Sequence, residues 1–450
     1  MNFYHFLIKI FLVFIALFAQ NTTAQNNFKL PDNLKKSKIN FKLVNNLIVV
    51  PVNINGVELS FILDTGVGST ILFSLENRDT LELKNASKIL LKGFGNDEPI
   101  EAVKSVSNQV KMGDAISDNH TIYLVYDQSI NFSPRMGFPI HGIIGYDFFK
   151  DFVVEINYSN KKITVIPSED FEFKKCRKCY QTDLKFLDGK RPFMDIKHLT
   201  SLGIVNLNLL LDSGSGSGLW LFENPDLGIE VPENSFKDYL GRGFSGDIYG
   251  RNSKINSLNI GPFELRNVTT SFPDSVHLAE ISVKERQGSI GAAVLKRFNV
   301  VLDYQRGKIS FRKNKYFNIS FNYNMSGLTI QHNGKILSKR PKVKKINQAG
   351  TIVKNSAGKI RSINEVEDFL IEYALQPKYE ILEIRPNSPG DEAGLLKGDV
   401  IIGLNGRDSS RYSLSEINDL FYSEEGKKIK LTIDRGGVVM TFTFFLEKVI

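Results

Sequence analysis

Cysteine, tryptophan and histidine are all scarce in this chain of 450 residues, which has two, one and six of them. Two cysteines are too few for a disulfide-stapled small domain or for a four-cysteine zinc site. The histidines are scattered, and no His-Glu-x-x-His pattern occurs. We therefore expect a protein that works without a metal ion or any other cofactor.

Concentrated basic charge is also lacking. The formal net charge of +8 is modest for this length, and Asp and Glu are interspersed among the Lys and Arg residues. This pattern predicts no nucleic-acid partner. A Gly-x-Gly-x-x-Gly string occurs at 241–246, but the strand-like residues 247–250 follow it where a dinucleotide site requires a helix. We expect no nucleotide site there.

Long apolar runs are missing after the N-terminus. Residues 1–24 have the layout of a signal peptide, with Lys9, an apolar run from Ile10 to Ala19, and a polar stretch that permits cleavage after Ala24. The run is too short for a comfortable membrane span. We expect an exported protein, periplasmic or secreted, with no stable span in its mature form. Association with the outer surface and an uncleaved N-terminal anchor remain alternatives.

The two cysteines are close neighbours, Cys176 and Cys179. In an exported protein they can close a small disulfide loop. The strand-helix-strand context of a thioredoxin-like redox site is missing around them. We therefore expect either a local disulfide or two free thiols, without a catalytic role.

An internal repeat organises the first two thirds of the chain. An apolar segment leads into Asp64-Thr65-Gly66, and a second one leads into Asp212-Ser213-Gly214. Ile143-Ile144-Gly145 follows Asp64 and the matching Ser289-Ile290-Gly291 follows Asp212, with the glycines 81 and 79 residues after the aspartates. Several landmarks recurring in register indicate duplication of one lobe.

Each repeat has the pattern of β structure. Residues 48–54 alternate, Asn55-Gly56 is a hairpin signal, and 59–63 continue as the next strand. Helical periodicity is nearly absent before residue 360. The sequence predicts a mainly β protein with two barrel-like lobes, at 38–167 and 180–315, and short helices only.

The two Asp-Thr/Ser-Gly turns resemble the active-site turns of aspartic proteases, over about residues 40–315. The retropepsin-like, single-chain bacterial members of that family fit better than pepsin, because both lobes are short and similar. The resemblance implies that Asp64 and Asp212 are catalytic. Two carboxyl groups held together cannot both ionise easily, so one acts as a base on water while the other donates a proton to the substrate carbonyl.

Five neighbouring residues support the two aspartates in this interpretation. Gly66 and Gly214 permit the tight turns, and the resemblance implies that the hydroxyls of Thr65 and Ser213 cross-link them. Ser215 can hydrogen-bond Asp212, whereas Val67, at the matching position in lobe one, cannot do this for Asp64. We therefore expect the ionised form to be less stabilised at Asp64.

Glycines also occur where flap hairpins fall in such enzymes. The flap candidates are Gly93, Phe94 and Gly95 in lobe one, and Gly243 and Phe244 in lobe two. Glycine would permit flap motion and a close approach to an extended peptide. Ordinary hairpin turns are the alternative.

The chain from 320 to 450 is similar to the PDZ domains, of α+β fold, in exported bacterial proteases. The resemblance rests on 387–395 and on Lys397-Gly398-Asp399-Val400-Ile401-Ile402. Such domains bind a peptide as an added strand and hold its terminal carboxylate on backbone N–H groups. A long insertion, 331–378, departs from the pattern and includes an expected helix at Asn364–Leu375. The expected peptide-binding residues are Gly327, Leu328, Thr329, Ile330, Leu414 and Ile417.

These patterns predict an aspartic endopeptidase whose PDZ domain binds the termini of substrate or partner peptides. Both catalytic turns lie in one chain, so we expect a monomer. One alternative is a non-catalytic peptide-binding protein with a degenerate cleft, and the presence of both Asp64 and Asp212 argues against it. Another is a processing protease with one narrow protein target.

Overall fold

Two compact units make up the chain. The computed structural model describes residues 27–75, 80–91, 100–125, 131–173, 175–187, 189–243, 246–278, 285–354 and 360–450. One unit runs up to Tyr323 and includes the last three residues, Lys448–Ile450, and the other is Asn324–Glu447. The expected signal peptide, 1–24, lies outside the described residues. No helix in the described part is long and apolar enough to cross a membrane.

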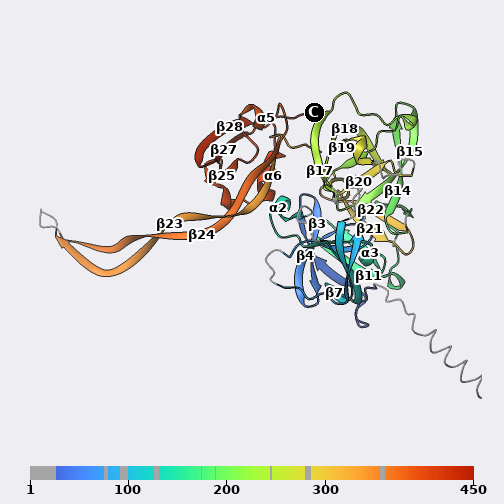
Figure 1. The fold of residues 1–450 in the computed structure, drawn as a ribbon, viewed down its shortest axis with the longest axis horizontal. Coiled ribbons are helices and arrows are strands. Elements are labelled where there is room, and N and C mark those ends of the chain that lie inside the picture. Colours follow the sequence, from blue (N-terminus) through green and yellow to red (C-terminus); the bar gives the residue numbers. More distant parts are fainter. Residues whose placement is uncertain are drawn as a thin grey trace, which may run out of the picture. The chain divides into compact units, whose positions relative to one another are not determined.

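Lobe one of the larger unit, which includes β3, β4 and β7 in Figure 1, is a β sheet. Its eight described strands follow the order β2-β3-β4-β9-β5-β8-β7-β6. Asn55 and Gly56 join β3 to β4 with φ values of 48° and 92°, which confirms the predicted hairpin. The strands are β2 (Lys42–Val44), β3 (Leu47–Ile54), β4 (Val57–Leu63), β5 (Thr70–Leu72), β6 (Ala86–Leu91), β7 (Ile100–Met112), β8 (Ala115–Val125) and β9 (Gly142–Ile144).

Lobe two repeats this arrangement. Its eight described strands follow the order β13-β14-β15-β20-β16-β19-β18-β17, so β15 and β20 occupy the places of β4 and β9. The strands are β13 (Lys185–Phe186), β14 (Pro192–Thr200), β15 (Gly203–Asp212), β16 (Leu219–Leu221), β17 (Phe236–Gly243), β18 (Gly246–Ile260), β19 (Phe263–Pro273) and β20 (Gly288–Gly291).

A third sheet joins the two lobes. Its described strands follow the order β1-β11-β10-β21-β22-β12, and β10 of lobe one pairs antiparallel with β21 of lobe two, with Val154 opposite Leu302. Buried apolar side chains of both lobes therefore form one continuous cluster. The strands are β1 (Ser37–Asn40), β10 (Phe152–Asn157), β11 (Lys162–Pro167), β12 (Cys179–Asp183), β21 (Phe298–Asp303) and β22 (Lys308–Lys313).

Helices in this unit are short, as the sequence predicts. Each described helix spans one turn, and none can bury a long amphipathic face. They are α2 (Ser133–Met136), α3 (Tyr146–Phe149), α4 (Ala292–Leu295), η2 (Ser168–Asp170), η3 (Pro225–Leu227) and η4 (Ser275–Leu278). The expectation of a mainly β fold is confirmed.

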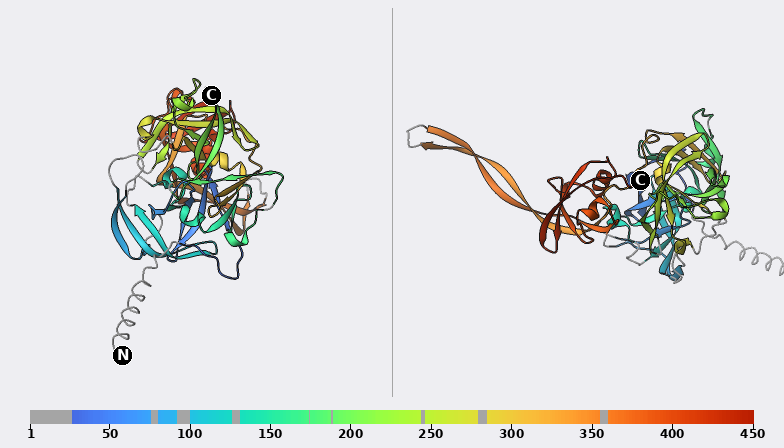
Figure 2. Two further views of the ribbon diagram at one scale, coloured as in Figure 1. Left: turned by 90° about the vertical axis from the view of Figure 1, so that its right-hand side faces the viewer. Right: turned by 90° about the horizontal axis from the view of Figure 1, so that it is seen from above.

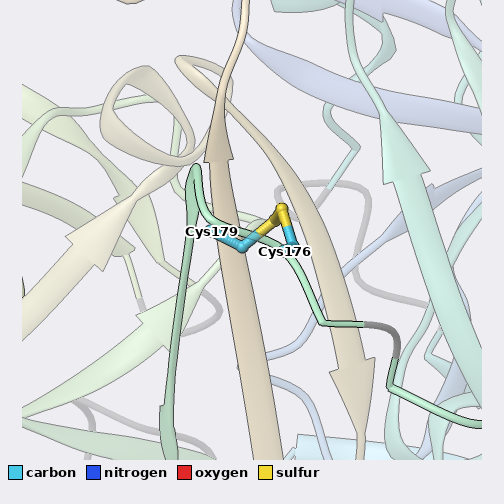
Figure 3. Close-up of a disulfide and its surroundings, with 2 residues drawn as sticks. All are labelled: Cys176 and Cys179. Carbon is cyan, nitrogen blue, oxygen red and sulfur yellow. A yellow bond between two sulfur atoms is a disulfide. The ribbon is translucent and has the colours of Figure 1, made fainter.

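The two cysteines form a disulfide, Cys176–Cys179, immediately before and at the start of β12 (Figure 3). This is one of the two alternatives left open by the sequence. The two bridged cysteines are only three residues apart in the sequence. A loop this short removes little entropy from the unfolded chain, so the stabilisation is at most about 2–3 kcal/mol.

The smaller unit contains a β sheet whose described strands follow the order β23-β24-β25-β27-β28, and β26 pairs with β25. Its core includes Leu328, Ile381, Leu414 and Ile417, all at most 1% exposed. Ser413 caps α6 reciprocally with Glu416, so the start of this helix is set by adjacent residues. The elements are β23 (Leu328–Lys354), β24 (Ile360–Ile384), α5 (Pro389–Glu392), β25 (Val400–Leu404), β26 (Arg407–Asp408), η5 (Ser409–Arg411), α6 (Leu414–Phe421), β27 (Lys428–Arg435) and β28 (Val438–Phe445).

The insertion 331–378 is a long two-stranded ribbon, and the expected helix at Asn364–Leu375 is wrong. That stretch belongs to β24, which pairs antiparallel with β23 along most of its length. Figure 2 shows the twisted ribbon running out from the rest of this unit. The sequence contains a period of two, in Phe369, Ile371, Tyr373 and Leu375, that fits a strand as well as the helical spacing does. Pairing with β23 decides between the two.

Candidate active site

The two Asp-containing turns start from equivalent strands. β4 pairs in parallel with β9, with Leu63 opposite Ile144, and β15 pairs in parallel with β20, with Leu211 opposite Ile290. Asp64 and Asp212 each come directly after these positions. Both aspartates therefore leave the centre of a sheet at the same point relative to the Ile-Gly pair of the neighbouring strand.

Thr65 and Ser213 cross-link the turns. The Thr65 N–H donates to the Ser213 hydroxyl at 3.0 Å, and the Ser213 N–H donates to the Thr65 hydroxyl at 3.0 Å. Each hydroxyl donates in turn to the opposite strand, Thr65 to the Leu211 carbonyl at 2.6 Å and Ser213 to the Leu63 carbonyl at 2.9 Å. Both side chains are buried, so this set of bonds fixes one turn against the other.

Gly66 and Gly214 lie against the carboxyl groups. The Gly66 N–H donates to Asp64 Oδ1 at 2.6 Å, and the Gly214 N–H donates to the same oxygen at 3.2 Å. A Cβ placed on Gly66 would lie 3.1 Å from Asp64 Oδ1 and 3.2 Å from Asp212 Oδ1. Oxygens of both carboxyl groups are therefore close to one point, and the two aspartates form a pair.

The glycine that ends each Ile-Gly pair, Gly145 or Gly291, lies directly against a turn. A Cβ on Gly145 would lie 2.2 Å from the Asp64 carbonyl oxygen, and one on Gly291 would lie 2.2 Å from the Ser217 carbonyl oxygen. Such distances leave no room for a side chain. These glycines therefore permit the close packing that holds the two turns from below.

Burial disfavours the ionised form of both carboxyl groups. The pKa of Asp64 is raised from 3.8 to about 7, first by burial and then by the negative charge of Asp212, against the opposing effect of the Gly66 and Gly214 N–H groups. Burial also raises the pKa of Asp212. Two such groups retain one proton between them at mildly acidic to neutral pH.

Positive charge near Asp212 makes the pair unequal. The Arg286 guanidinium gives the largest effect that lowers the pKa of Asp212, followed by the Ser215 and Gly214 N–H groups and by Arg191. The expected inequality is present, but it comes from two arginines and a backbone N–H group of Ser215, whereas the sequence suggested the Ser215 hydroxyl. Arg191 and Arg286 belong to no motif, so no local pattern pointed to them.

The flap candidates are only partly described. Gly93, Phe94 and Gly95 lie outside the described residues, as does Phe244. Gly243 ends β17, opposite Gly246 at the start of β18. Arg135 of α2 in lobe one donates to Tyr239 Oη and pairs with Asp247 Oδ1 at 3.2 Å, so this hairpin of lobe two is tied to lobe one.

The expected peptide-binding residues of the smaller unit lie around β23 and α6. Gly327 has a φ of +77° immediately before β23, which is an edge strand of its sheet. Thr329 is partly buried. Leu328, Ile330, Leu414 and Ile417 are at most 3% exposed and belong to one core cluster. These four side chains therefore belong to the core of this unit and not to its exposed surface.

Metal-ligating side chains do not gather in the described part of the chain: no group of three or more His, Cys, Asp or Glu residues there is placed to hold an ion. The dyad itself offers two carboxyl groups, and the cations near it are arginines. The arrangement can hold a water molecule between two carboxyl groups that differ in proton affinity.

Comparison with known proteins agrees with this geometry. Residues 50–148 match the family model of aspartyl proteases, and residues 380–435 match that of PDZ domains. These two segments are therefore similar to an aspartyl protease domain and to a PDZ domain. The two resemblances inferred from the sequence are thereby confirmed. The match to the aspartyl protease family covers the turn at Asp64, while the turn at Asp212 lies beyond it.

Among solved structures, the aspartic proteinase from Irpex lacteus is similar to this chain. The two are 11% identical, the comparison covers 64% of this chain and 100% of that one, and the TM-score is 0.40. No curated protein sequence matches the chain.

Proposed function

We propose that this protein is an aspartic endopeptidase whose dyad is Asp64 and Asp212. The observation that carries the proposal is the pair of carboxyl groups on turns cross-linked by Thr65 and Ser213. Such a pair holds one proton, which is the state that general acid and base catalysis on a peptide bond requires. Both turns are supplied by one chain, so a monomer is sufficient.

The chemistry follows from that shared proton. The ionised carboxyl group takes a proton from water, and the water oxygen attacks the carbonyl carbon of the peptide bond. The protonated carboxyl group gives its proton to the carbonyl oxygen. The carboxyl group that took the water proton then gives it to the amine nitrogen, and a hydroxyl of the tetrahedral intermediate gives its proton to the other carboxylate. The C–N bond breaks, which leaves a carboxylic acid, an amine and a dyad with one shared proton.

The test is cleavage of a peptide library across pH by the wild type and by Asp64→Asn and Asp212→Asn. Each substitution removes an ionisable carboxyl group while keeping its size, so each should abolish cleavage with the fold intact. Asp195→Asn is the matched control, because Asp195 is an exposed residue of lobe two paired with Lys185. Substantial turnover by either dyad variant contradicts the assignment. Binding of a hydroxyl-containing transition-state mimic without any cleavage would favour a non-catalytic peptide-binding protein.

The PDZ domain is proposed to bind peptide termini of the substrate or of a partner. The free edge of β23 can accept an added strand beside α6, and the Gly327 turn precedes it as the carboxylate-binding loop does in such domains. Binding of a peptide with a free C-terminal carboxylate should be lost when that terminus is amidated. Equal binding of both peptides contradicts capture of the terminus.

The proposed location is outside the cytoplasm, periplasmic or secreted, on the basis of residues 1–24. Cell fractionation tests this, together with N-terminal sequencing of the mature protein. A mature N-terminus near residue 25 supports export and cleavage. A full-length chain in the membrane fraction favours an uncleaved anchor.

A further inference from the structure

The two lobes have matching hydrogen bonds beside the strands that lead into Asp64 and Asp212, so residues of one lobe can be paired with residues of the other. In lobe one, the His141 N–H donates to the Ser60 carbonyl at 2.8 Å, and the Ser60 N–H donates to His141 Nδ1 at 3.0 Å. In lobe two, the Gln287 N–H donates to the Asn208 carbonyl at 3.1 Å, and the Asn208 N–H donates to Gln287 Oε1 at 2.8 Å. His141 and Gln287 therefore hold equivalent places.

The same correspondence extends to the neighbouring strands. The Phe73 N–H donates to the His141 carbonyl at 2.9 Å, and the Phe222 N–H donates to the Gln287 carbonyl at 2.9 Å. Three side chains in lobe one thus have three counterparts in lobe two. The pairs are Phe73 with Phe222, Ile140 with Arg286 and Ile143 with Ser289.

Lobe two differs from lobe one at two of these three positions. In lobe one, Phe73, Ile140 and Ile143 are buried in one apolar cluster. In lobe two, the two isoleucines are replaced by Arg286 and Ser289. A single Ile→Arg change would leave a largely buried cation against an apolar neighbour, whereas the Ser289 hydroxyl supplies an acceptor for it.

Arg286 is held firmly but has no carboxylate in contact. Its Nη2 donates to Ser289 Oγ at 2.7 Å and its Nε donates to the Gly288 carbonyl at 3.2 Å, while the guanidinium lies 5.3 Å from the centre of the Phe222 ring. Among the described residues no ion pair within 4.0 Å involves Arg286. Burial lowers its pKa to about 10, and the charge of Asp212 opposes that effect. β15 pairs in parallel with β20, with Leu210 opposite Ser289 and Asp212 opposite Gly291. The Ser289 side chain that holds the guanidinium therefore lies on the same face of the sheet as the Asp212 side chain, with one residue pair between them.

We propose that Arg286 is a positioning residue that holds Asp212 in its ionised form and so leaves the shared proton on Asp64. This inference rests on the proposed endopeptidase function and assigns the roles within it. Asp212 is then the base that takes the proton from water, and Asp64 is the acid that protonates the carbonyl oxygen. Ser289 fixes the guanidinium in the orientation that this role requires.

The other charged and titratable groups around the pair are few in the described part of the chain. Asp212 interacts with Arg286 and with Arg191, the residue before β14, and Asp64 interacts with Asp212. On the far side of the dyad, the buried Tyr304 interacts with Asp64 and keeps its own proton because burial raises its pKa. Arg191 acts on Asp212 in the same direction as Arg286 but more weakly, so Arg286 is the residue to test.

The test compares Arg286→Gln, Arg286→Lys and the double variant Arg286→Ile with Ser289→Ile. The double variant recreates the apolar pair of lobe one, which packs against a phenylalanine in the same way, and it keeps the test valid if Arg286→Gln fails to fold. Arg266→Gln is the control. It removes the same charge from an exposed residue of lobe two that pairs with Glu264 at 3.0 Å.

Two readouts are needed. The first is the titration of the Asp212 carboxyl carbon by 13C NMR, assigned by its loss in Asp212→Asn, and the second is the pH profile of kcat/KM. The NMR midpoint and the acidic limb of the profile should move up by about one pH unit in Arg286→Gln and in the double variant, as expected for loss of a cation acting through a partly polar interior. The NMR midpoint and the acidic limb of Arg286→Lys should stay near the wild-type values, and those of Arg266→Gln should not change.

An unchanged NMR midpoint in a folded Arg286→Gln or double variant overturns the inference. Failure of the proposed function looks different. The wild type would then hydrolyse no peptide at any pH, while the NMR titration still reports whether Arg286 controls Asp212. A midpoint that moves equally in Arg286→Lys and Arg286→Gln also contradicts the inference, because it indicates packing rather than charge.

Discussion

The hydroxyl of Thr65 and the hydroxyl of Ser213 each accept the backbone N–H of the other residue at 3.0 Å, across a separation of 148 residues in the chain. Each also donates to a carbonyl of the opposite strand. All of these groups are buried, so none of the bonds can be replaced by bulk water. The spacing of the dyad therefore depends on two side chains that do not themselves take part in proton transfer.

Ser213→Ala tests this cross-link. The substitution leaves the Thr65 N–H and the Leu63 carbonyl without partners in a buried place, at a cost of about 1–3 kcal/mol each. We expect a lower melting temperature for the protease unit and a loss of kcat/KM, measured by calorimetry and peptide cleavage. Ser213→Thr is the control, because threonine occupies the matching position in lobe one. Equal stability of the Ala and Thr variants would contradict the role of the hydroxyl.

Asp64→Asn should stabilise the protease unit at neutral pH and leave its stability unchanged near pH 4. The folded-state pKa of about 7 lies above the usual 3.8. The unfolded chain therefore loses this proton first, and the stability of the wild type falls as pH rises from about 4 to 7. Asparagine has no such titration. The expected gain at pH 8 is on the order of 2–4 kcal/mol, measured as a pH series of melting temperatures. A gain that is constant with pH would rule out titration as its cause.

Gly214→Ala should damage catalysis far more than Gly66→Ala. The added Cβ on Gly214 would lie 2.1 Å from Asp64 Oδ2, whereas the one on Gly66 has its nearest contact at 3.1 Å. The Cβ added in Gly214→Ala must displace the Asp64 carboxyl group, whereas the Cβ added in Gly66→Ala requires only a small shift of its neighbours. Because misplacing a catalytic group by about 1 Å costs roughly 100-fold, we expect a loss in kcat/KM of at least about that size for Gly214→Ala. Similar losses in the two variants would argue against the packing seen here.

Removing the distal ribbon should leave the PDZ domain folded. Its core cluster contains Ile330 and Tyr379 but none of 331–335 and 375–378, the described residues at the base of the ribbon. Replacing residues 335–376 by an Asn-Gly turn should therefore shift the melting temperature of this domain by only a few degrees. Ile417→Ala, in the same core, is the contrasting variant and should cost about 2–5 kcal/mol. Unfolding of the shortened variant would show that the ribbon is part of the folding unit.

The PDZ domain should matter for protein substrates and little for short peptides. Tethering a substrate by its terminus raises its concentration at the cleft to the mM range for a short linker. A suitable variant replaces 324–447 with a flexible linker and keeps both attachment points on β18. Tyr323 Oη donates to the Ser253 carbonyl at 2.5 Å, and Lys254 Nζ donates to the Ile450 main-chain oxygen at 3.0 Å.

The measurement is the ratio of kcat/KM for one target protein to that for a short peptide spanning its cut site. We expect the ratio to fall in the variant without the PDZ domain, while peptide cleavage stays near the wild-type rate. An unchanged ratio would show that the PDZ domain does not bring substrates to the cleft, and would favour a role as a scaffold or an anchor.

Much of the architecture could be predicted from local pattern. The alternation before Asn55-Gly56 and the capping pair at Ser413 and Glu416 encode a hairpin and a helix start within a few residues, because turn and cap geometry depend on adjacent backbone groups. The stretch at Asn364–Leu375 was predicted wrongly because its apolar spacing satisfies two periods. Only the partner strand β23, at a distance in sequence, supplies the hydrogen bonds that select the strand.

The sequence by itself determined the two Asp-containing turns, their glycines and hydroxyls, and the PDZ pattern, since each is a short string whose chemistry requires those residues in that order. The tertiary structure decided the rest. The pairing of β10 with β21, which merges the lobes, joins segments about 150 residues apart. The placement of Arg286 near Asp212 likewise depends on how β20 lies beside β15. Electrostatic effects act through space, so no local string could have revealed which charge acts on which carboxyl group.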